Sequence, residues 1–241
     1  MRRGELGFWL RFAACVLKPL LFVFTRHRWR GLEHVPAAGG VIFCFNHVSY
    51  FDPPVVAHFV YDLPRTPRFL AKESLFGLPL VGRVFRGAGQ IAVPRGTAVA
   101  SSSLRGAQAA LARGDAVIIY PEGTVTRDPD LWPMTGKTGA ARLALETGAP
   151  VIPVAQWGAQ RLYDGRTRKV RLRPRTPVEL LAGPPVDLSP WAGQPLTGPV
   201  LRAATDAIMC RLRDQLAELR GETPPAAFFS LVAVVRTKDG G

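Results

Sequence analysis

Cysteine, acidic residues and long apolar runs are all scarce in this chain of 241 residues. The three cysteines, Cys15, Cys44 and Cys210, lie far apart, so they form no metal-binding or paired spacing and favour a reducing compartment. No uninterrupted apolar run reaches the roughly 18 residues of a membrane-spanning helix. With 18 acidic against 31 basic residues the net charge is +13, which favours anionic partners: nucleic acid, an acidic membrane surface or phosphorylated substrates.

Apolar runs that alternate with helical stretches predict an α/β fold after the first 30 residues. We expect a single domain over residues 31–221, with a central mixed sheet flanked by helices, and a tail over residues 222–241. The expected strands are 41–45, 68–71, 90–93, 116–120, 151–156 and 178–181, the last preceded by a basic strand or ribbon over 166–175. The expected helices are 54–60, 75–85, 97–113, 137–146 and 201–220.

The first 30 residues predict an amphipathic, membrane-associating helical segment. Residues 6–24 are rich in Phe, Trp and Leu but are interrupted by Arg11 and Lys18. These two are seven positions apart, so they share one helical face, which we expect to turn toward lipid headgroups. A soluble core helix is the alternative. The pattern places the protein at the cytoplasmic face of the cell membrane, as a peripheral or monotopic protein.

A histidine follows the buried strand predicted at residues 41–45. His47 is followed five positions later by Asp52. A carboxylate that accepts a proton from one imidazole nitrogen fixes the tautomer and leaves the other nitrogen free to act as a general base. The pair alone is a weak signal. His27, His34 and His58 have no carboxylate in a comparable setting, and we interpret them as surface or structural residues.

Two further segments place polar groups at strand ends, where α/β folds gather their ligand sites. Residues 120–124 read Tyr-Pro-Glu-Gly-Thr, and Arg95 follows the strand predicted at 90–93. A guanidinium suits phosphate, which it can grip with two hydrogen bonds. The chain has no Gly-x-Ser-x-Gly elbow and no P-loop. A base and anion binders without an obvious covalent nucleophile fit direct attack by a substrate hydroxyl.

Together with the strand predicted at 151–156, these segments occur in the same order as the four motifs of the glycerolipid acyltransferases, and they most closely resemble those of the 1-acylglycerol-3-phosphate acyltransferases. The likeness covers roughly residues 30–190 and rests on 47–52, Arg95, 122–124 and 151–154. The resemblance implies that His47 deprotonates the acceptor hydroxyl and that Asp52 orients His47. The expected reaction moves a fatty acyl group from acyl-CoA or acyl carrier protein to lysophosphatidic acid, giving phosphatidic acid in phospholipid biosynthesis, without a metal or cofactor.

The same resemblance assigns the acceptor-binding region. Arg95 would hold the glycerol phosphate, together with Glu122, Gly123 and Thr124. The chain departs from the family pattern at three positions, where Ala92, Pro94 and Val125 replace an aromatic, an often acidic and a basic residue. Arg127 could replace the missing arginine. Lys72 and Lys137 could help to bind the phosphate.

Three alternatives remain open from the sequence. The acceptor could be another lysophospholipid or glycerol 3-phosphate. The arginines at 166–175 could instead mark a protein that binds nucleic acid or an anionic membrane, although that stretch lacks the interleaved aromatics that stack on bases, so we expect no nucleic acid. An inactive scaffold is a third reading, against which the intact His47 and Asp52 argue.

Overall fold

A seven-stranded mixed sheet forms the centre of the protein, in the order β1-β7-β6-β2-β5-β3-β4. The computed structural model describes residues 7–63, 65–94 and 100–230. All neighbouring strands are parallel except β6 and β7, which are antiparallel. The strands are β1 (Thr25–Arg30), β2 (Val41–Phe45), β3 (Pro67–Lys72), β4 (Ile91–Val93), β5 (Ala116–Ile119), β6 (Val151–Trp157) and β7 (Thr176–Ala182). The predicted α/β fold with a mixed central sheet is confirmed.

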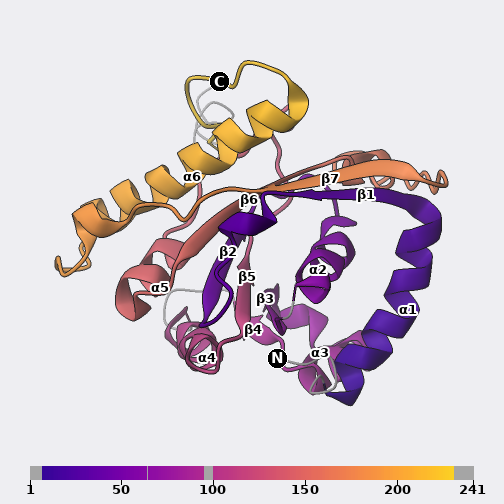
Figure 1. The fold of residues 1–241 in the computed structure, drawn as a ribbon, viewed down its shortest axis with the longest axis horizontal. Coiled ribbons are helices and arrows are strands. Elements are labelled where there is room, and N and C mark those ends of the chain that lie inside the picture. Colours follow the sequence, from indigo (N-terminus) through magenta and orange to yellow (C-terminus); the bar gives the residue numbers. More distant parts are fainter. Residues whose placement is uncertain (1–6, 64, 95–99, 231–241) are drawn as a thin grey trace, which may run out of the picture.

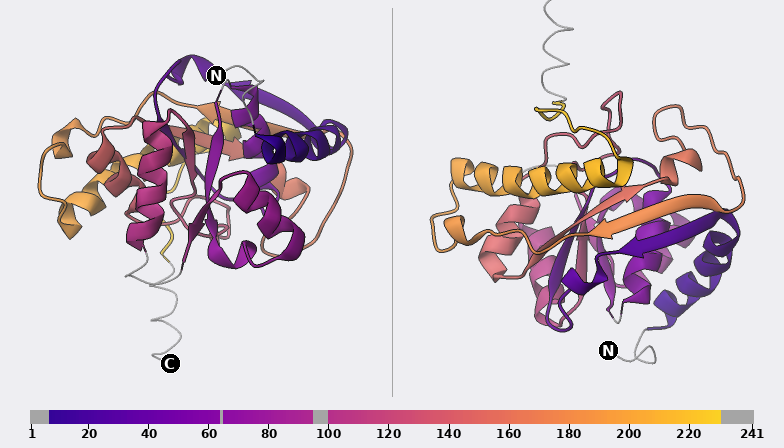
Figure 2. Two further views of the ribbon diagram at one scale, coloured as in Figure 1. Left: turned by 90° about the horizontal axis from the view of Figure 1, so that it is seen from below. Right: turned by 45° about the horizontal axis from the view of Figure 1, so that its top comes forward.

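Helices cover both faces of the sheet, which explains why its central strands are apolar throughout. Strand β2 is buried at all five positions. Alternate residues of β2 belong to two separate cores, with Ile42 and Cys44 on one face and Phe43 and Phe45 on the other. Figure 1 shows α1 and α2 on one side of the sheet and α4, α5 and α6 on the other, and Figure 2 shows α6 lying along the sheet. The helices are α1 (Phe8–Phe24), α2 (Asp52–Asp62), α3 (Pro79–Gly87), α4 (Ala100–Ala112), α5 (Gly139–Thr147) and α6 (Gly198–Arg220).

The N-terminal segment differs from the expectation in two respects. The helix ends at Phe24, and Thr25–Arg30 continue directly as the edge strand β1, which pairs with β7. The expectation that Arg11 and Lys18 both face headgroups is wrong for Lys18. Its ammonium group bonds to Asp62 on α2 at 2.9 Å, because α1 packs its Lys18 side against that helix.

The basic segment at residues 166–175 is a loop and not the predicted strand. A single bridge joins Tyr163 to Val170, and regular pairing begins only at β7. Arg168 and Arg175 have φ angles of 56° and 53°, a left-handed conformation that a strand cannot accommodate. The backbone N–H of Arg175 donates to the carbonyl of Val23, so this loop adjoins the end of α1.

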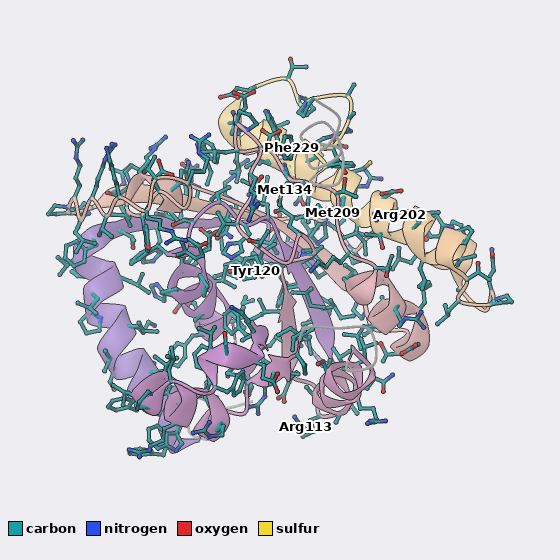
Figure 3. The ribbon with its side chains drawn as sticks, turned by 180° about the vertical axis from the view of Figure 1, so that it is seen from behind. Arg113, Tyr120, Met134, Arg202, Met209 and Phe229 are labelled. Atoms are coloured by element: carbon teal, nitrogen blue, oxygen red, sulfur yellow. The ribbon has the colours of Figure 1, made fainter. Side chains whose placement is uncertain are left out.

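The C-terminal tail after α6 contacts the loop between β5 and α5. Phe229 forms a bridge with Met134, and its carbonyl accepts the N–H of Thr135 at 3.0 Å. Met134 and Phe229 accordingly lie side by side in Figure 3. The rest of the predicted tail, residues 231–241, lies outside the described residues.

Candidate active site

His47 and Asp52 meet at the turn that joins β2 to α2. One carboxylate oxygen of Asp52, Oδ2, accepts hydrogen bonds from three donors: His47 Nδ1 at 2.8 Å and the backbone N–H groups of Val48 and Ser49 at 2.7 and 2.8 Å. Asp52 is fully buried at the first position of α2, where the helix dipole favours a negative charge. Burial raises the pKa of Asp52, and the hydrogen bonds from His47 and the two amides oppose that shift. The predicted pairing of His47 with Asp52 is present.

The imidazole of His47 is held on two sides. Asp52 occupies Nδ1, so Nε2 is the nitrogen that remains for a substrate proton. The aromatic ring of Tyr120 stacks on the imidazole, with ring centroids 4.2 Å apart and planes inclined by 24°. The side chain of His47 is 12% exposed, so the ring is neither sealed in the core nor free in solvent. Such a histidine can act as a general base.

Glu122 braces the backbone around His47. Its Oε1 accepts the N–H of His47 at 2.9 Å, and its Oε2 accepts the N–H of Met134 at the same distance. The carboxyl group is buried, and this burial raises its pKa to about 8. Glu122 therefore links the loops that follow β2 and β5. Its predicted part in acceptor binding stays a prediction.

Gly123 and Lys137 lie together beside Glu122. Gly123 has a φ angle of 72°, and a Cβ added to it would lie 2.8 Å from Lys137 Nζ. The backbone N–H of Lys137 donates to the carbonyl of Pro121 at 2.8 Å, which fixes the lysine next to this turn. The positive φ angle favours glycine at this position, and the exposed, flexible end of the Lys137 side chain lies beside it. Thr124 follows, half-buried.

The remaining basic residues of the predicted acceptor site are less closely tied to His47. Arg127 is exposed, and its backbone N–H donates to the sulfur of Met134 at 3.3 Å. Lys72 is exposed at the end of β3, where it pairs in register with Val93 of β4. Arg95 lies outside the described residues. The structure therefore brings together His47, Asp52, Glu122, Gly123 and Lys137.

An amide pair that the sequence analysis did not identify locks β2 to β6 behind the site. Asn46 donates to the carbonyl of Gln156 and accepts its N–H, and the Gln156 side chain donates to the carbonyl of Asn46, at 3.1, 2.7 and 2.6 Å. Both residues are buried. The available signal was an amide residue at the end of each of two adjacent apolar strands. Tyr120 and Met134 were missed as well, because their contacts depend on strand register and loop path.

A second cluster lies at the far end of α2. Within the part of the chain that the structure describes, the one group of three potential metal ligands is His27, His58 and Asp62, whose ligand atoms lie within 4.8 Å of one another. The Nε2 atom of His58 lies 3.3 Å from Asp62, a carboxylate in a more exposed setting than Asp52. The carboxylate of Asp62 already accepts hydrogen bonds from Lys18 and Trp29. These hydrogen bonds give the cluster a structural role that joins α1, β1 and α2.

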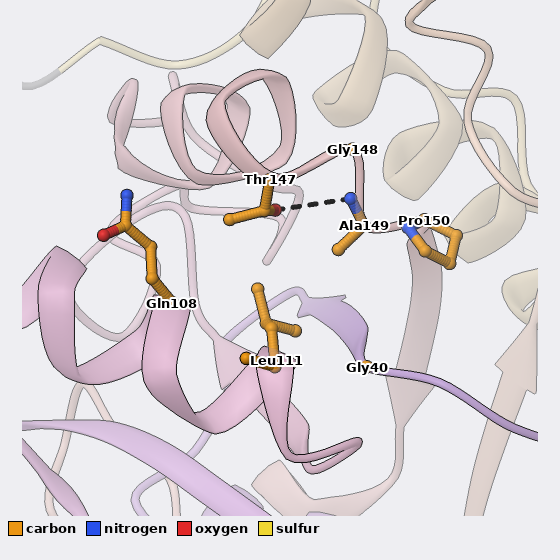
Figure 4. A pocket seen from close by; sticks show the side chains of 8 residues that line it. Gly40, Gln108, Leu111, Thr147, Gly148, Ala149 and Pro150 are labelled. Carbon is orange, nitrogen blue, oxygen red and sulfur yellow. Dashed lines mark hydrogen bonds between the residues drawn. The ribbon is translucent and has the colours of Figure 1, made fainter.

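A pocket of about 450 Å³ opens at the opposite end of the sheet from His47. Gly40 and Pro150, which precede β2 and β6, line it together with Leu111 of α4 and Thr147 of α5 (Figure 4). The hydroxyl of Thr147 accepts the N–H of Ala149 at its rim. Since His47 and Glu122 follow the carboxyl ends of β2 and β5, whereas Gly40 and Pro150 precede their strands, this pocket is not part of the candidate active site.

Comparisons with known proteins agree with this geometry. A family model of acyltransferases matches residues 26–157. An uncharacterized protein of Mycobacterium leprae is 30% identical over 251 residues, which cover 91% of this chain and 66% of the relative. A 1-acyl-sn-glycerol-3-phosphate acyltransferase of Borreliella burgdorferi is 30% identical over 157 residues, which cover 62% of this chain and 58% of that enzyme. The chain therefore spans less than two thirds of the length of these curated relatives.

A solved structure shares the fold. The crystal structure of the 1-acyl-sn-glycerophosphate (LPA) acyltransferase from Thermotoga maritima superposes with a TM-score of 0.63 at 26% sequence identity. The match covers 90% of this chain and 81% of that one. The likeness therefore extends over most of both chains.

Proposed function

The chain belongs to the acyltransferase family, and we propose that it transfers a fatty acyl group from acyl-CoA or acyl carrier protein to the free hydroxyl of lysophosphatidic acid. The observation that carries the proposal is the buried pair of His47 and Asp52, which leaves Nε2 as the basic nitrogen. The product would be phosphatidic acid, an intermediate of phospholipid biosynthesis. The named relatives with lysophosphatidic acid as acceptor support this choice.

The proposed reaction is a direct displacement. Nε2 of His47 takes the proton of the acceptor hydroxyl while its oxygen forms a bond to the thioester carbonyl carbon. The carbon–sulfur bond then breaks, and the proton passes from His47 to the leaving thiolate. Asp52 keeps Nδ1 protonated and offsets the positive charge that the imidazole acquires. Each bond change is supplied by the substrates and His47, so the scheme calls for no metal or cofactor.

The acceptor phosphate would bind the basic residues around the Glu122–Gly123 turn. Lys137 Nζ lies beside Gly123, the residue after Glu122, whose carboxyl group accepts the N–H of His47. Arg127, Lys72 and Arg95 are further candidates for this role. A charge-assisted hydrogen bond to phosphate adds affinity for the acceptor without changing the chemical step. Lys137→Met should therefore raise KM for lysophosphatidic acid more than it lowers kcat.

The outer face of α1 supports a position at an anionic membrane surface. Phe8, Phe12, Val16, Leu20 and Val23 follow at helical spacing and are each between 41% and 71% exposed. A continuous apolar stripe of this kind is typical of helices that lie in the bilayer interface. No helix among the described residues has the length and apolar character needed to cross a bilayer. We propose a peripheral or monotopic protein at the cytoplasmic face of the cell membrane.

The basic loop at residues 166–175 would strengthen this attachment. It adjoins the end of α1 through Arg175 and presents Val170 and Leu172 among its arginines. Each basic residue near an anionic surface adds about 1 kcal/mol of attraction. Phe12→Gln combined with Val16→Gln should reduce flotation with liposomes at high salt. Leu32→Gln, an exposed apolar position between β1 and β2, is the matched control. Equal flotation of both variants would place the attachment elsewhere.

A parallel assay tests the enzymatic proposal. Purified protein is given labelled acyl-CoA or acyl carrier protein, with lysophosphatidic acid, glycerol 3-phosphate or another lysophospholipid as acceptor. Labelled phosphatidic acid as the main product is the expected result. Transfer to another acceptor would correct the substrate. Absence of transfer from either donor to every acceptor, by protein with a folded circular dichroism spectrum, would refute the proposal.

A further inference from the structure

Tyr120 makes the closest aromatic contact with His47. The proposed acyl transfer gives Tyr120 no role. It follows β5, whereas His47 follows the neighbouring strand β2, and the pairing of Cys44 with Ile119 brings the two strand ends level. The two rings are nearly parallel, with centroids 4.2 Å apart. Figure 3 shows Tyr120 near the centre of the molecule.

Aromatic neighbours contact the ring of Tyr120. Phe45, two residues before His47, packs against the Tyr120 ring, with 6.1 Å between the ring centroids. The hydroxyl oxygen is buried and interacts with the side chain of Gln156, which lowers the pKa of Tyr120 against the larger, opposite effect of burial. Burial also holds the pKa of Tyr120 well above its ordinary value, so the phenol stays neutral in any ordinary assay. The contact of Tyr120 with His47 is made by the face of its ring.

We propose that Tyr120 is a positioning residue whose ring face orients the His47 imidazole and stabilises the imidazolium that forms when His47 takes a proton. The electron-rich face of an aromatic ring attracts a cation placed over it, and the attraction is larger where water is excluded. Asp52 acts on the edge of the imidazole through Nδ1, while Tyr120 acts on its face. Together they restrict both rotations of the ring, so that Nε2 keeps one direction.

This inference deepens the proposed acyl transfer and rests on it for its kinetic part. During attack, the proton of the acceptor hydroxyl moves to Nε2 and the imidazole becomes positively charged, before the same proton leaves with the thiolate. The attraction of the ring for a cation exists only while His47 carries that charge. Its loss should consequently slow the chemical step and leave acceptor binding unchanged.

Two substitutions separate the ring from the hydroxyl. Tyr120→Phe keeps the aromatic face, and we expect kcat within about twofold of the wild type. Tyr120→Leu keeps apolar volume but has no π face, and we expect kcat to fall by about 3- to 30-fold while KM for the acceptor stays within about twofold. Equal kcat values for the two variants, or a change confined to KM, would overturn the proposal.

A spectroscopic measurement tests the contact without any substrate. A stacked aromatic ring shifts the imidazole proton signals of His47 upfield, and His47→Gln identifies those signals by their loss. We expect the shift in the wild type and in Tyr120→Phe, and its disappearance in Tyr120→Leu or, should that variant not fold, in Tyr120→Met. Unshifted His47 signals in the wild type would refute the stacking. Because this result does not depend on turnover, a wild type that transfers no acyl group would refute the proposed function alone.

Discussion

A histidine–aspartate pair lies at each end of helix α2. The two pairs differ in the burial of the aspartate and in the other groups that the aspartate binds. At the first turn, Asp52 is fully buried and receives His47 together with two backbone N–H groups. At the last turn, the side chain of Asp62 is 28% exposed and is shared between His58 and the cation of Lys18. A carboxylate bonded to a cation has less of its charge available to orient and support a protonated imidazole.

The histidines differ in the same sense. Burial lowers the pKa of His58 to about 4, against its ordinary value of 6.5, so this imidazole is neutral and structural at physiological pH. His47 stands at the carboxyl end of a central parallel strand, with Glu122 and Lys137 close by on the next loop. Contact between a histidine and an aspartate is thus insufficient to define a general base. The free nitrogen and the neighbouring groups decide between the two pairs.

Replacing each histidine by alanine should show the largest difference between the two pairs in kcat and in stability. His47→Ala should lower kcat by about 10²- to 10⁴-fold, since a general base is lost, while the fold is retained. His58→Ala should leave kcat of the folded protein within about twofold and lower the free energy of unfolding by about 1–3 kcal/mol, because a buried ring that packs against His27 and Trp29 is removed. Acyl-transfer kinetics and urea unfolding measure the two effects. Substantial turnover by His47→Ala would refute the mechanism.

The two carboxylates provide the next test. Asp52→Asn should lower kcat by at least about tenfold, because an amide neither offsets the charge on His47 nor fixes its tautomer in the same way. Asp62→Asn, the same change at the other end of α2, should leave kcat nearly unaffected. Acyl transfer by both variants under one set of conditions makes the comparison. Full activity in Asp52→Asn would show that Asp52 only supports the turn.

Glu122, which binds the backbone of His47, should make the free energy of unfolding depend on pH. Its folded pKa of about 8 lies above its ordinary value of 4.5, so between these values the folded state holds a proton that the unfolded state has released. The free energy of unfolding should therefore fall as pH rises through this window, by at most about 1.4 kcal/mol per pH unit.

The change Glu122→Gln should remove this part of the pH dependence. Glu33→Gln, at a side chain that is 75% exposed, should retain it and serves as the control. Denaturant unfolding at a series of pH values between 5 and 8.5 gives the three curves. If the wild type and Glu122→Gln follow parallel curves, Glu122 does not titrate in this window.

Much of the fold followed from the sequence because its signals were local. Residues 41–45 are five consecutive apolar side chains, and burial on both faces of a parallel sheet explains them. The pairing of His47 with Asp52 was accessible because the turn and the first residue of α2 are only five positions apart. Strand β1 was missed because Thr-Arg-His-Arg-Trp-Arg is polar, as an edge strand can be, and its pairing with β7 spans about 150 residues of chain.

The parts that could not be predicted depend on tertiary packing. Helical periodicity places Arg11 and Lys18 on similar sides of α1, but it does not say which side α2 covers, and that decides the fate of Lys18. The stack of Tyr120 on His47 depends on the register of β5 against β2, and the two bonds of Glu122 depend on how residues 122–134 return to the sheet. None of these has a signature in residue spacing.

The smallest expected effect concerns Lys18, the cation that distinguishes Asp62 from Asp52. Lys18→Met keeps most of the apolar stem and removes the charge from a pair whose side chains are 35% and 28% exposed. Solvent screens such a pair, so the free energy of unfolding should fall by only about 0.2–1 kcal/mol, and the difference should shrink at high salt. Acyl transfer to a short-chain, water-soluble acceptor should stay at the wild-type rate, because Lys18 binds Asp62, which lies ten residues along α2 from Asp52. A loss of kcat at unchanged stability would contradict this separation, since it would mean that the cluster at the end of α2 acts on His47 through the helix.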